Sequence, residues 1–245
     1  MPIMVNTLRI SPHGLGTRGF LWQAVDLVIP PFCCHCGRLG YEICPQCFSE
    51  IELLEHSEYC EKCGQARHSS GICLSKGNYF DQIHSWGYYA GPLKSIVQKL
   101  KFHRGIGLAI YLVPNISESI RQLFHELDAI VPLPLGRKRQ LSRGYNQTAI
   151  IAKPLAQNLD INYFPNSVVR IRETTSQVGL SARERQANIR DAFFAKEQLV
   201  QGQNILLLDD ITTTGATINE CAKALKLAGA ASVSCFTLAK AKNLI

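Results

Sequence analysis

The sequence predicts an α/β fold in which a mostly parallel sheet is flanked by helices, with a small cysteine-rich module on its N-terminal side. From residue 81 onward, short apolar runs typical of strands alternate with segments of helical period, and this alternation indicates parallel strands joined by helices. Eight of the ten cysteines lie between Cys33 and Cys73, which sets the first part of the chain apart. A chain of 245 residues that is 46% apolar can bury a sizeable core.

Three parts are expected along the chain: a mobile polar tail over residues 1–20, a cysteine-rich module over residues 21–80 and an α/β domain over residues 81–245. The tail contains GLGTRG, a literal match to the dinucleotide-binding fingerprint. We interpret this match as coincidence, because the candidate strand before it is only about five residues long and the expected acidic partner would fall among the cysteines.

Composition also bounds the location and the partners. No apolar stretch reaches the roughly 20 residues that a bilayer span requires, so we expect no membrane span. The N terminus lacks the residue order of a secretory signal, and we therefore expect a cytoplasmic protein. The net charge of +7 favours phosphate-bearing partners such as nucleotides or nucleic acid, although an excess of this size also serves solubility.

The elements of the α/β domain are predicted from their period and their end signals. A strand is expected within residues 83–90, followed by helices near residues 92–102 and 107–126. The run DAIVPLP predicts a buried strand that ends at Pro132. After it we expect a helix over residues 147–158, strands in SVVRI and DAFFA, a buried strand in NILLLD, a helix over residues 217–227 and a last strand in SVSCFTLA.

Two Cys-x-x-Cys pairs open the cysteine-rich module, with the thiols of Cys33, Cys36, Cys44 and Cys47. A glycine after the first pair, Gly37, frees the backbone to turn tightly. Four thiolates in two such pairs are typical of a closed tetrahedral zinc site. We expect structural zinc here, and a redox-active dithiol is the alternative.

A second cysteine group is incomplete. Cys60 and Cys63 form another pair and Cys73 adds a third thiolate, but Lys76 stands where a fourth cysteine is expected. His68 or a water molecule can take the fourth position around a second zinc. Alternatively, the site has decayed and these cysteines pack as small apolar residues.

The stretch LLLDDITTTGATI carries the most specific chemical signal. The buried strand NILLLD brings Asp209 and Asp210 to the carboxyl end of the sheet, where ligands bind in open α/β folds. Successive strand residues point to opposite faces, so we expect the strand to end at this pair if both side chains face one ligand. Two carboxylates that only accept hydrogen bonds suit two neighbouring sugar hydroxyls.

The loop that follows the acid pair runs into a helix. Backbone amides at a helix N-terminus favour a phosphate, threonine hydroxyls add donors, and a glycine lets the backbone come close. The loop lacks the lysine of a P-loop, so acid pair and loop together indicate a ribose 5-phosphate. A capped helix after an acidic turn is the alternative. The loop residues are Thr212, Thr213, Thr214, Gly215, Ala216 and Thr217.

The stretch ILLLDDITTTGATI resembles the signature of type I phosphoribosyltransferases. The resemblance implies that Asp209 and Asp210 hold the ribose hydroxyls of phosphoribosyl pyrophosphate (PRPP), and that residues 213–217 hold its 5-phosphate. It also implies a type I phosphoribosyltransferase-like sheet for residues 81–245.

Three further segments, YAGPLKSIVQKLKFHRG, VPLPLGRKRQLSRGYNQ and TTSQVGLSARERQANIRDAF, together with the cysteine module, resemble the ComF/GntX family of competence-associated proteins. The resemblance spans roughly residues 25–240. Members of that family usually carry a complete second cysteine quartet, and Lys76 departs from that pattern. The resemblance implies a role in natural transformation, with single-stranded DNA and DNA-uptake or recombination proteins as partners.

Cations are expected around the ligand. The segment after VPLP carries Arg137, Lys138, Arg139 and Arg143, which can meet the pyrophosphate together with Mg²⁺. We expect Asp209, Asp210 and Arg143 to act in catalysis. The segment with Arg183 and Arg185 is expected to form a mobile hood or, alternatively, an ordinary surface helix. A second basic group, Lys99, Lys101 and Arg104, is expected outside the ligand loops. Both basic groups and the cysteine module are candidates for a DNA surface, and the alternative is that residues 137–143 serve only pyrophosphate.

Two functions remain open from the sequence. One is a PRPP-binding protein that acts on internalised single-stranded DNA. The other is an active phosphoribosyltransferase of nucleotide or small-molecule metabolism unrelated to DNA. Both need the same acid pair and threonine loop, and no residue identifies the acceptor.

Overall fold

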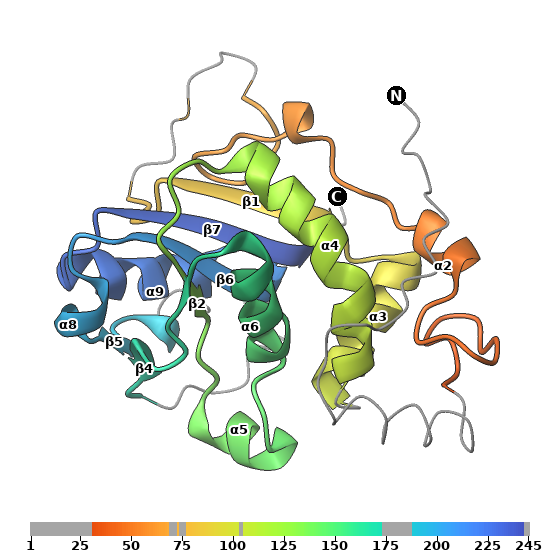
Figure 1. Cartoon of the computed structure of the whole chain (residues 1–245). Helices are drawn as coiled ribbons and strands as arrows, with labels where there is room; N and C mark the ends of the chain where they lie inside the picture. Colours follow the sequence, from red (N-terminus) through yellow and green to blue (C-terminus); the bar gives the residue numbers. More distant parts are fainter. Residues whose placement is uncertain (1–30, 69–72, 74–76, 103–104, 173–187, 243–245) are drawn as a thin grey trace.

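The computed structural model describes residues 31–68, 73, 77–102, 105–172 and 188–242, and it confirms the α/β fold. Five parallel strands form one sheet in the order β1-β7-β6-β2-β3 (Figure 1). The strands are β1 (Gln82–Tyr88), β2 (Ala129–Pro132), β3 (Asn162–Tyr163), β6 (Asn204–Thr212) and β7 (Ser232–Lys240). Residues 1–20, including GLGTRG, lie outside this description.

Helices cover both faces of the sheet (Figure 1). One face carries α3 (Gly91–Phe102), α4 (Ile106–Leu123) and α6 (Gln147–Leu159), and the other carries α9 (Ala216–Leu227). Because side chains alternate along a strand, Leu206 and Leu208 of β6 pack in the first core while Ile205 and Leu207 pack in the second. Every described helix is too short or too polar to span a bilayer.

Local signals explain where the two helices next to the site, α6 and α9, begin. The side chain of Asn146 accepts a hydrogen bond from the amide of Thr148 at 3.0 Å and so caps the start of α6. Gly215 precedes α9 with a φ of 74°, a conformation that glycine adopts without strain. The bounds of the predicted helices and long strands agree with the structure to within a few residues.

Two arrangements were not predicted. The strands β4 (Val168–Arg170) and β5 (Phe193–Ala195) pair antiparallel in a separate two-stranded sheet, because their apolar side chains pack against α9 instead of joining the main sheet. The basic segment after β2 forms the helix α5 (Arg137–Arg143), which buries none of its residues and so shows no apolar period. Unpredicted short elements are β3 and α8 (Glu197–Val200).

The cysteine-rich segment lies directly against the α/β domain. Its described helices are α2 (Pro45–Ser49) and a 3-10 helix (His56–Glu58). Cys33, Cys44 and Cys47 are buried in the same core as α3 and α4. Backbone hydrogen bonds from Leu54 to Trp86, 3.1 Å, and from Tyr88 to Glu52, 2.9 Å, join the segment to β1. The module and the domain thus share one apolar core.

Candidate ligand cleft and metal sites

An open cleft of about 510 Å³ lies at the carboxyl ends of β2 and β6. Its volume is in the range of about 300–1,000 Å³ that small-molecule sites occupy. Residues 133–135, which follow β2, form one wall, and residues 209–218 form another. The cleft is therefore at the edge where the sequence placed the ligand.

Asp209 and Asp210 both line this cleft, but they reach it from opposite faces of β6. We expected the strand to end at the acid pair, but it continues to Thr212. Asp210 lies on the face of α3 and α6, and Asp209 on the face of α9. The two carboxylates therefore have different surroundings.

Asp210 belongs to a network that joins four elements. Its Oδ2 atom lies 3.2 Å from the ammonium of Lys101 on α3 and accepts a 2.7 Å hydrogen bond from the amide of Gln147 on α6. The Oε1 atom of Gln147 in turn accepts a 2.7 Å hydrogen bond from Arg143 on α5. Because Gln147 is buried, this network holds Asp210 and Arg143 in a fixed relation.

Asp209 is held in an environment that disfavours its charge. Burial raises the pKa of Asp209 well above its usual range, and the neighbouring charge of Asp210 raises it further. The backbone amide of Asp210 donates a 2.8 Å hydrogen bond to Oδ1 of Asp209, which opposes the shift without cancelling it. A buried carboxyl of this kind is destabilising when ionised, so it points to a role other than stability.

The raised pKa of Asp209 predicts a pH-dependent stability. The folded protein binds this proton more tightly than the unfolded chain, whose aspartates titrate at about 3.9. As pH rises above that value the unfolded chain ionises first, so the free energy of unfolding falls. We expect the ligand-free Asp209→Asn variant to melt higher than the wild type at neutral pH.

Melting curves across pH check this prediction. At about pH 3 aspartic acid is protonated in both states, so the two proteins should melt together. The difference in melting temperature between the variant and the wild type should grow as pH rises toward neutrality. A constant gap, or a less stable variant at every pH, would contradict the assignment of a buried, destabilising carboxyl at this position.

The loop from Thr212 to Gly215 lines the cleft and leads into the N-terminus of α9. All six predicted loop residues, Thr212 to Thr217, line the cleft. The space beside Gly215 is open, since a Cβ built there meets no atom within 4 Å. Helix N-terminal amides and threonine hydroxyls around an open space suit an anionic group.

Four cations line the cleft: Lys101, Arg139, Arg143 and Arg170. The guanidinium groups of Arg143 and Arg170 lie over aromatic rings, at 5.4 Å from the centre of Phe102 and 5.7 Å from the centre of Phe193 respectively. With two carboxylates among the same lining residues, four cations leave a formal charge of +2. The cleft is thus suited to a ligand with several negative charges.

The sequence located these cations only in part. Arg139 and Arg143 were expected here, whereas Arg137 and Lys138 are exposed on α5, outside the lining of the cleft. Lys101 was expected outside the ligand site, and that expectation is wrong, because Lys101 pairs with Asp210. Lys99 pairs with Glu42 of the cysteine-rich segment. Arg104, Arg183 and Arg185 lie outside the described residues.

The first cysteine group has the geometry of a zinc site. The sulfur atoms of Cys33, Cys36, Cys44 and Cys47 lie within 4.8 Å of one another, with Cys36 and Cys44 3.7 Å apart. Thiolates at about 2.3 Å from a tetrahedral zinc lie roughly 3.8 Å from each other. Burial disfavours the charged thiolate of Cys33, but backbone hydrogen bonds outweigh it and lower the pKa to about 6. This group can therefore hold zinc.

The second group gains its fourth ligand from His68. Its Nε2 atom lies 3.4 Å from the sulfur of Cys63, and the ligand atoms of Cys60, Cys63, His68 and Cys73 lie within 4.8 Å of one another. Three sulfurs and one imidazole are a common zinc ligand set. Of the two interpretations left open by the sequence, the structure favours the one in which this group can hold a metal. Lys76 lies outside the described residues.

Comparison with known proteins shows which family the chain resembles. A family model described as "Phosphoribosyl transferase domain" matches residues 147–243. Competence protein F of Haemophilus influenzae is 33% identical over 227 residues, which cover 85% of this chain and 96% of that protein. The DNA utilization protein YhgH of Escherichia coli K12 is also 33% identical over 227 residues, with 87% and 99% covered. A solved adenine phosphoribosyltransferase from Thermoanaerobacter pseudethanolicus matches 61% of this chain and 73% of its own, with 18% identity and a TM-score of 0.36.

The parallel sheet and the family match over residues 147–243 define a type I phosphoribosyltransferase-like domain. An N-terminal cysteine module that can hold zinc precedes it. The chain belongs to the ComF/GntX family, since Competence protein F matches it at 33% identity over nearly its whole length.

Proposed function

We propose that the chain binds PRPP in the cleft and acts in natural transformation, in the handling of internalised single-stranded DNA. One observation carries the ligand: two carboxylates, a threonine loop at a helix N-terminus and four cations line a single cleft. The family match over residues 147–243 and the competence name of a relative support the proposal.

Each part of PRPP has a counterpart in the cleft. Asp209 and Asp210 would accept hydrogen bonds from the two ribose hydroxyls, and residues 213–217 would hold the 5-phosphate. Arg139 and Arg143 would meet the pyrophosphate. Mg²⁺ takes oxygen ligands and would add positive charge at the pyrophosphate, and the carboxylate and hydroxyl donors of the cleft suit it.

If turnover occurs, a nitrogen acceptor forms a bond to C1 of the ribose while the bond from C1 to pyrophosphate breaks. The protein would contribute electrostatically, because cations stabilise the departing charge and carboxylates position the ring. Apart from the acid pair, the described lining residues include no histidine, glutamate, tyrosine or cysteine that could take the acceptor's proton. The acceptor therefore remains open, and so does the alternative of a metabolic enzyme unrelated to DNA.

Pyrophosphate release separates the candidate functions. Purified protein with PRPP and Mg²⁺ would be tested against a panel of bases and amines, with calorimetry of PRPP alone beside it. Binding without release supports a PRPP-responsive binding protein, and release with one class of acceptor supports a phosphoribosyltransferase. Failure of PRPP to bind at all would remove the proposed ligand.

The finer parts of the proposal concern partners, domains and location. We infer a division into a cysteine-rich module up to residue 80 and a phosphoribosyltransferase-like domain from residue 81. DNA-uptake or recombination proteins as partners and a cytoplasmic location remain predictions from the resemblance and the sequence.

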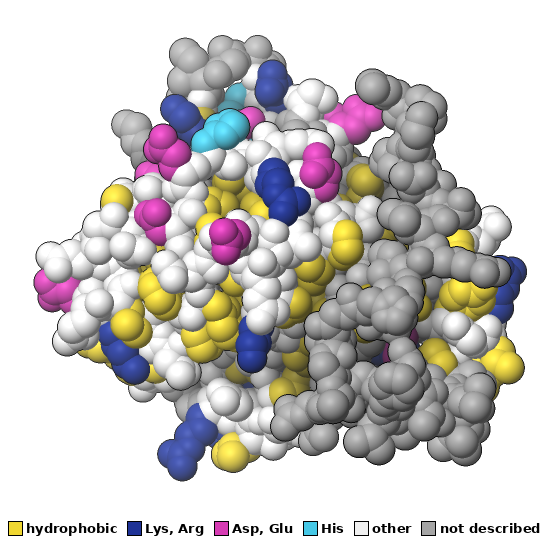
Figure 2. All heavy atoms as spheres, viewed as in Figure 1, with side chains coloured by type: hydrophobic (Ala, Val, Ile, Leu, Met, Phe, Trp, Pro, Cys, Tyr) yellow, Lys and Arg dark blue, Asp and Glu magenta, His cyan; other side chains and the backbone are white. Residues whose placement is uncertain are grey.

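Direct binding of single-stranded DNA would use α5 rather than the group around Lys99. Lys99 forms an ion pair with Glu42, and Lys101 forms one with Asp210. Replacing these lysines by acidic residues would therefore disturb the fold and the cleft. On the face seen in Figure 2, the described Lys and Arg side chains are scattered singly and form no continuous stripe. Arg137 and Lys138 are exposed beside the cleft and lie outside its lining.

Salt dependence tests this mode of binding. On a single strand, log affinity falls with log salt at a slope of about −0.7 per phosphate engaged. We expect Arg137→Gln with Lys138→Gln to make the slope shallower by about 0.7 for each phosphate that these side chains neutralise, with PRPP affinity unchanged. The matched control, Lys94→Gln with Lys153→Gln, removes the same charge from the exposed surfaces of α3 and α6. Equal slopes in both variants, or no binding to a long oligonucleotide at low salt, would exclude α5 as the DNA-binding element.

A further inference from the structure

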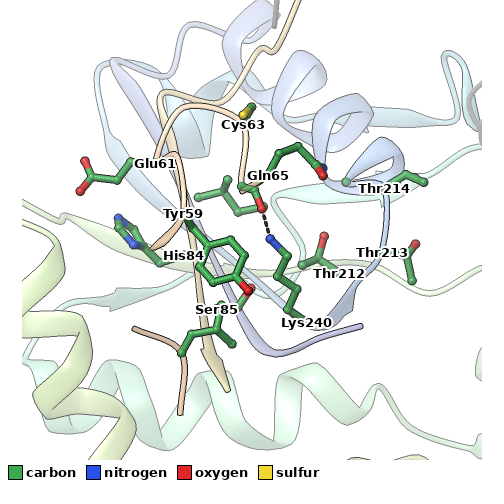
Figure 3. Close-up of a pocket in the computed structure, with 14 residues that line it drawn as sticks. Tyr59, Glu61, Cys63, Gln65, His84, Ser85, Thr212, Thr213, Thr214 and Lys240 are labelled. Atoms are coloured by element: carbon green, nitrogen blue, oxygen red, sulfur yellow. Dashed lines mark hydrogen bonds between the residues drawn. The ribbon is translucent and has the colours of Figure 1, made fainter. Parts of the chain in front are cut away.

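Lys240 links the second cysteine group to the loop of the cleft. It is the last residue of β7, where its backbone is paired with Thr212 at the start of that loop. Its ammonium donates a hydrogen bond to the carbonyl of Gly64, the residue after Cys63, and lies 3.9 Å from the ring centre of Tyr59 (Figure 3). A single buried side chain thus spans from the loop to the turn that contains Cys60, Cys63 and Gly64, here called the cysteine turn.

The surroundings of Lys240 are closely built. A narrow pocket between the cysteine turn and the sheet is lined by Gly64, Lys240 and the loop residues Thr212 to Gly215 (Figure 3). Figure 3 shows the Lys240 side chain extending toward the turn, with Thr212 beside it. The cysteine turn therefore lies against the back of the loop whose front faces the cleft.

The turn around Gly64 also brings the thiols of Cys60 and Cys63 together. Its backbone is closed by hydrogen bonds from the amide of Gly64 to Cys60, 2.7 Å, and from the amide of Cys60 to Gln65, 2.9 Å. Gly64 has a φ of 68°, and a Cβ there would lie 3.0 Å from Ile83. A metal ion would tie the four ligand side chains together and so keep the Gly64 carbonyl in place, because metal binding free energy adds to the stability of the segment that supplies the ligands.

The segment is also anchored on the far side of the loop. Asn219, in the first turns of α9, accepts a 2.7 Å hydrogen bond from the amide of Tyr79 and donates one of 3.3 Å to the carbonyl of Gly77. The amide of Ile83 donates to the carbonyl of Glu61 at 2.7 Å. The cysteine group is thus attached near both ends of the cleft loop, at β7 and at α9.

We propose that a metal ion held by Cys60, Cys63, His68 and Cys73 fixes the cleft loop through the hydrogen bond from Lys240 to Gly64, so that Lys240 is a positioning residue of the ligand site. This inference rests on the proposed binding of PRPP and adds a second metal centre that controls it. Loss of the metal frees the turn, removes the partner of a buried ammonium and loosens residues 212–215.

Two variants separate the metal from the link. His68→Ala should lower zinc from two ions per chain to one, and Lys240→Met should keep both ions but remove the hydrogen bond. Each should weaken PRPP binding about tenfold, within the range of couplings through packed networks. The double variant should be no weaker than either single one, because both changes break the same connection. His68→Cys supplies a fourth thiolate and should retain both zinc and affinity.

A matched control and a second measurement keep the test decisive. Lys242→Met changes the next but one residue, an exposed lysine that pairs with Glu52 and lies 4.9 Å from the ring centre of Tyr88, and should leave affinity unchanged. Amide hydrogen exchange of residues 212–217, measured without ligand, should quicken in His68→Ala and Lys240→Met only. If PRPP fails to bind the wild type, the proposed ligand fails while exchange still tests the link. Unchanged exchange, or affinity losses that add in the double variant, would overturn the inference.

Discussion

Replacing Asp209 and Asp210 together by asparagine is expected to weaken PRPP binding by several kcal/mol. Each charged hydrogen bond to a ribose hydroxyl contributes roughly 1.5–3 kcal/mol, and both carboxylates line the cleft. Asparagine keeps the shape and one oxygen acceptor, so the loss reports charge and not a change of volume. Titration calorimetry with PRPP and Mg²⁺ measures the effect directly.

The residue chosen as a control, Asp128, lies at the amino-terminal end of the strands, opposite the cleft. Asp128 accepts a 2.7 Å hydrogen bond from the amide of Asn204, at the amino end of β6, far along the strand from the cleft. Asp128→Asn should leave PRPP affinity and zinc content as they are. If the double variant at the acid pair binds PRPP as the wild type does, the acid pair does not hold the ribose.

The acid pair and its loop were predictable because their chemistry is contiguous. Residues 209–217 carry the carboxylates, the hydroxyls and the glycine within one short stretch after a buried apolar strand. The strand β6 was predictable from its continuous apolar run, and the helix α9 from a helical period over twelve residues. The first cysteine group was predictable because its spacing alone fixes the ligand set.

The partners of the acid pair were not predictable, because only folding brings them together. Gln147 lies 63 residues from Asp210 in sequence and resembles an ordinary first residue of a helix. Lys101 lies among the basic residues of α3, and nothing in its neighbours distinguishes it from Lys99. Arg170 lies in a segment that was predicted only as a strand, and nothing in the sequence indicated that its pairing with β5 brings a cation to the cleft.

His68 shows how far sequence reasoning reaches in the cysteine module. The sequence offered His68, a water molecule or decay as alternatives, because a histidine five residues after Cys63 has no fixed direction in a turn. The structure places its ring nitrogen beside the thiol group. The hydrogen bond from Lys240 to Gly64 spans 176 residues and no pattern in the sequence indicates it.

The first cysteine group should contribute more to stability than any other single feature of the fold. Structural zinc binds its ligands with an apparent free energy of about 10–16 kcal/mol at neutral pH, comparable to the whole stability of a typical domain, about 5–15 kcal/mol. Here Cys33, Cys44 and Cys47 are buried and pack against the same apolar core as Leu93 and Ile96 of α3. Loss of the metal would therefore leave cysteines without a ligand partner inside a core that the α/β domain shares.

We accordingly expect Cys44→Ser to lose the first zinc and most of the cooperative unfolding transition, measured by elemental analysis and by thermal melting. The matched control is Cys34→Ser, one residue from Cys33 but outside the ligand set, where burial raises the pKa of the thiol to about 11. That variant should keep both zinc ions and melt close to the wild type, because serine replaces a half-buried thiol that holds no metal. Chelation of the wild type removes the second zinc as well, and should therefore destabilise the fold at least as much as Cys44→Ser does. A Cys44→Ser protein that loses its zinc yet melts as the wild type does would show that the apolar contacts of this segment hold it without a metal.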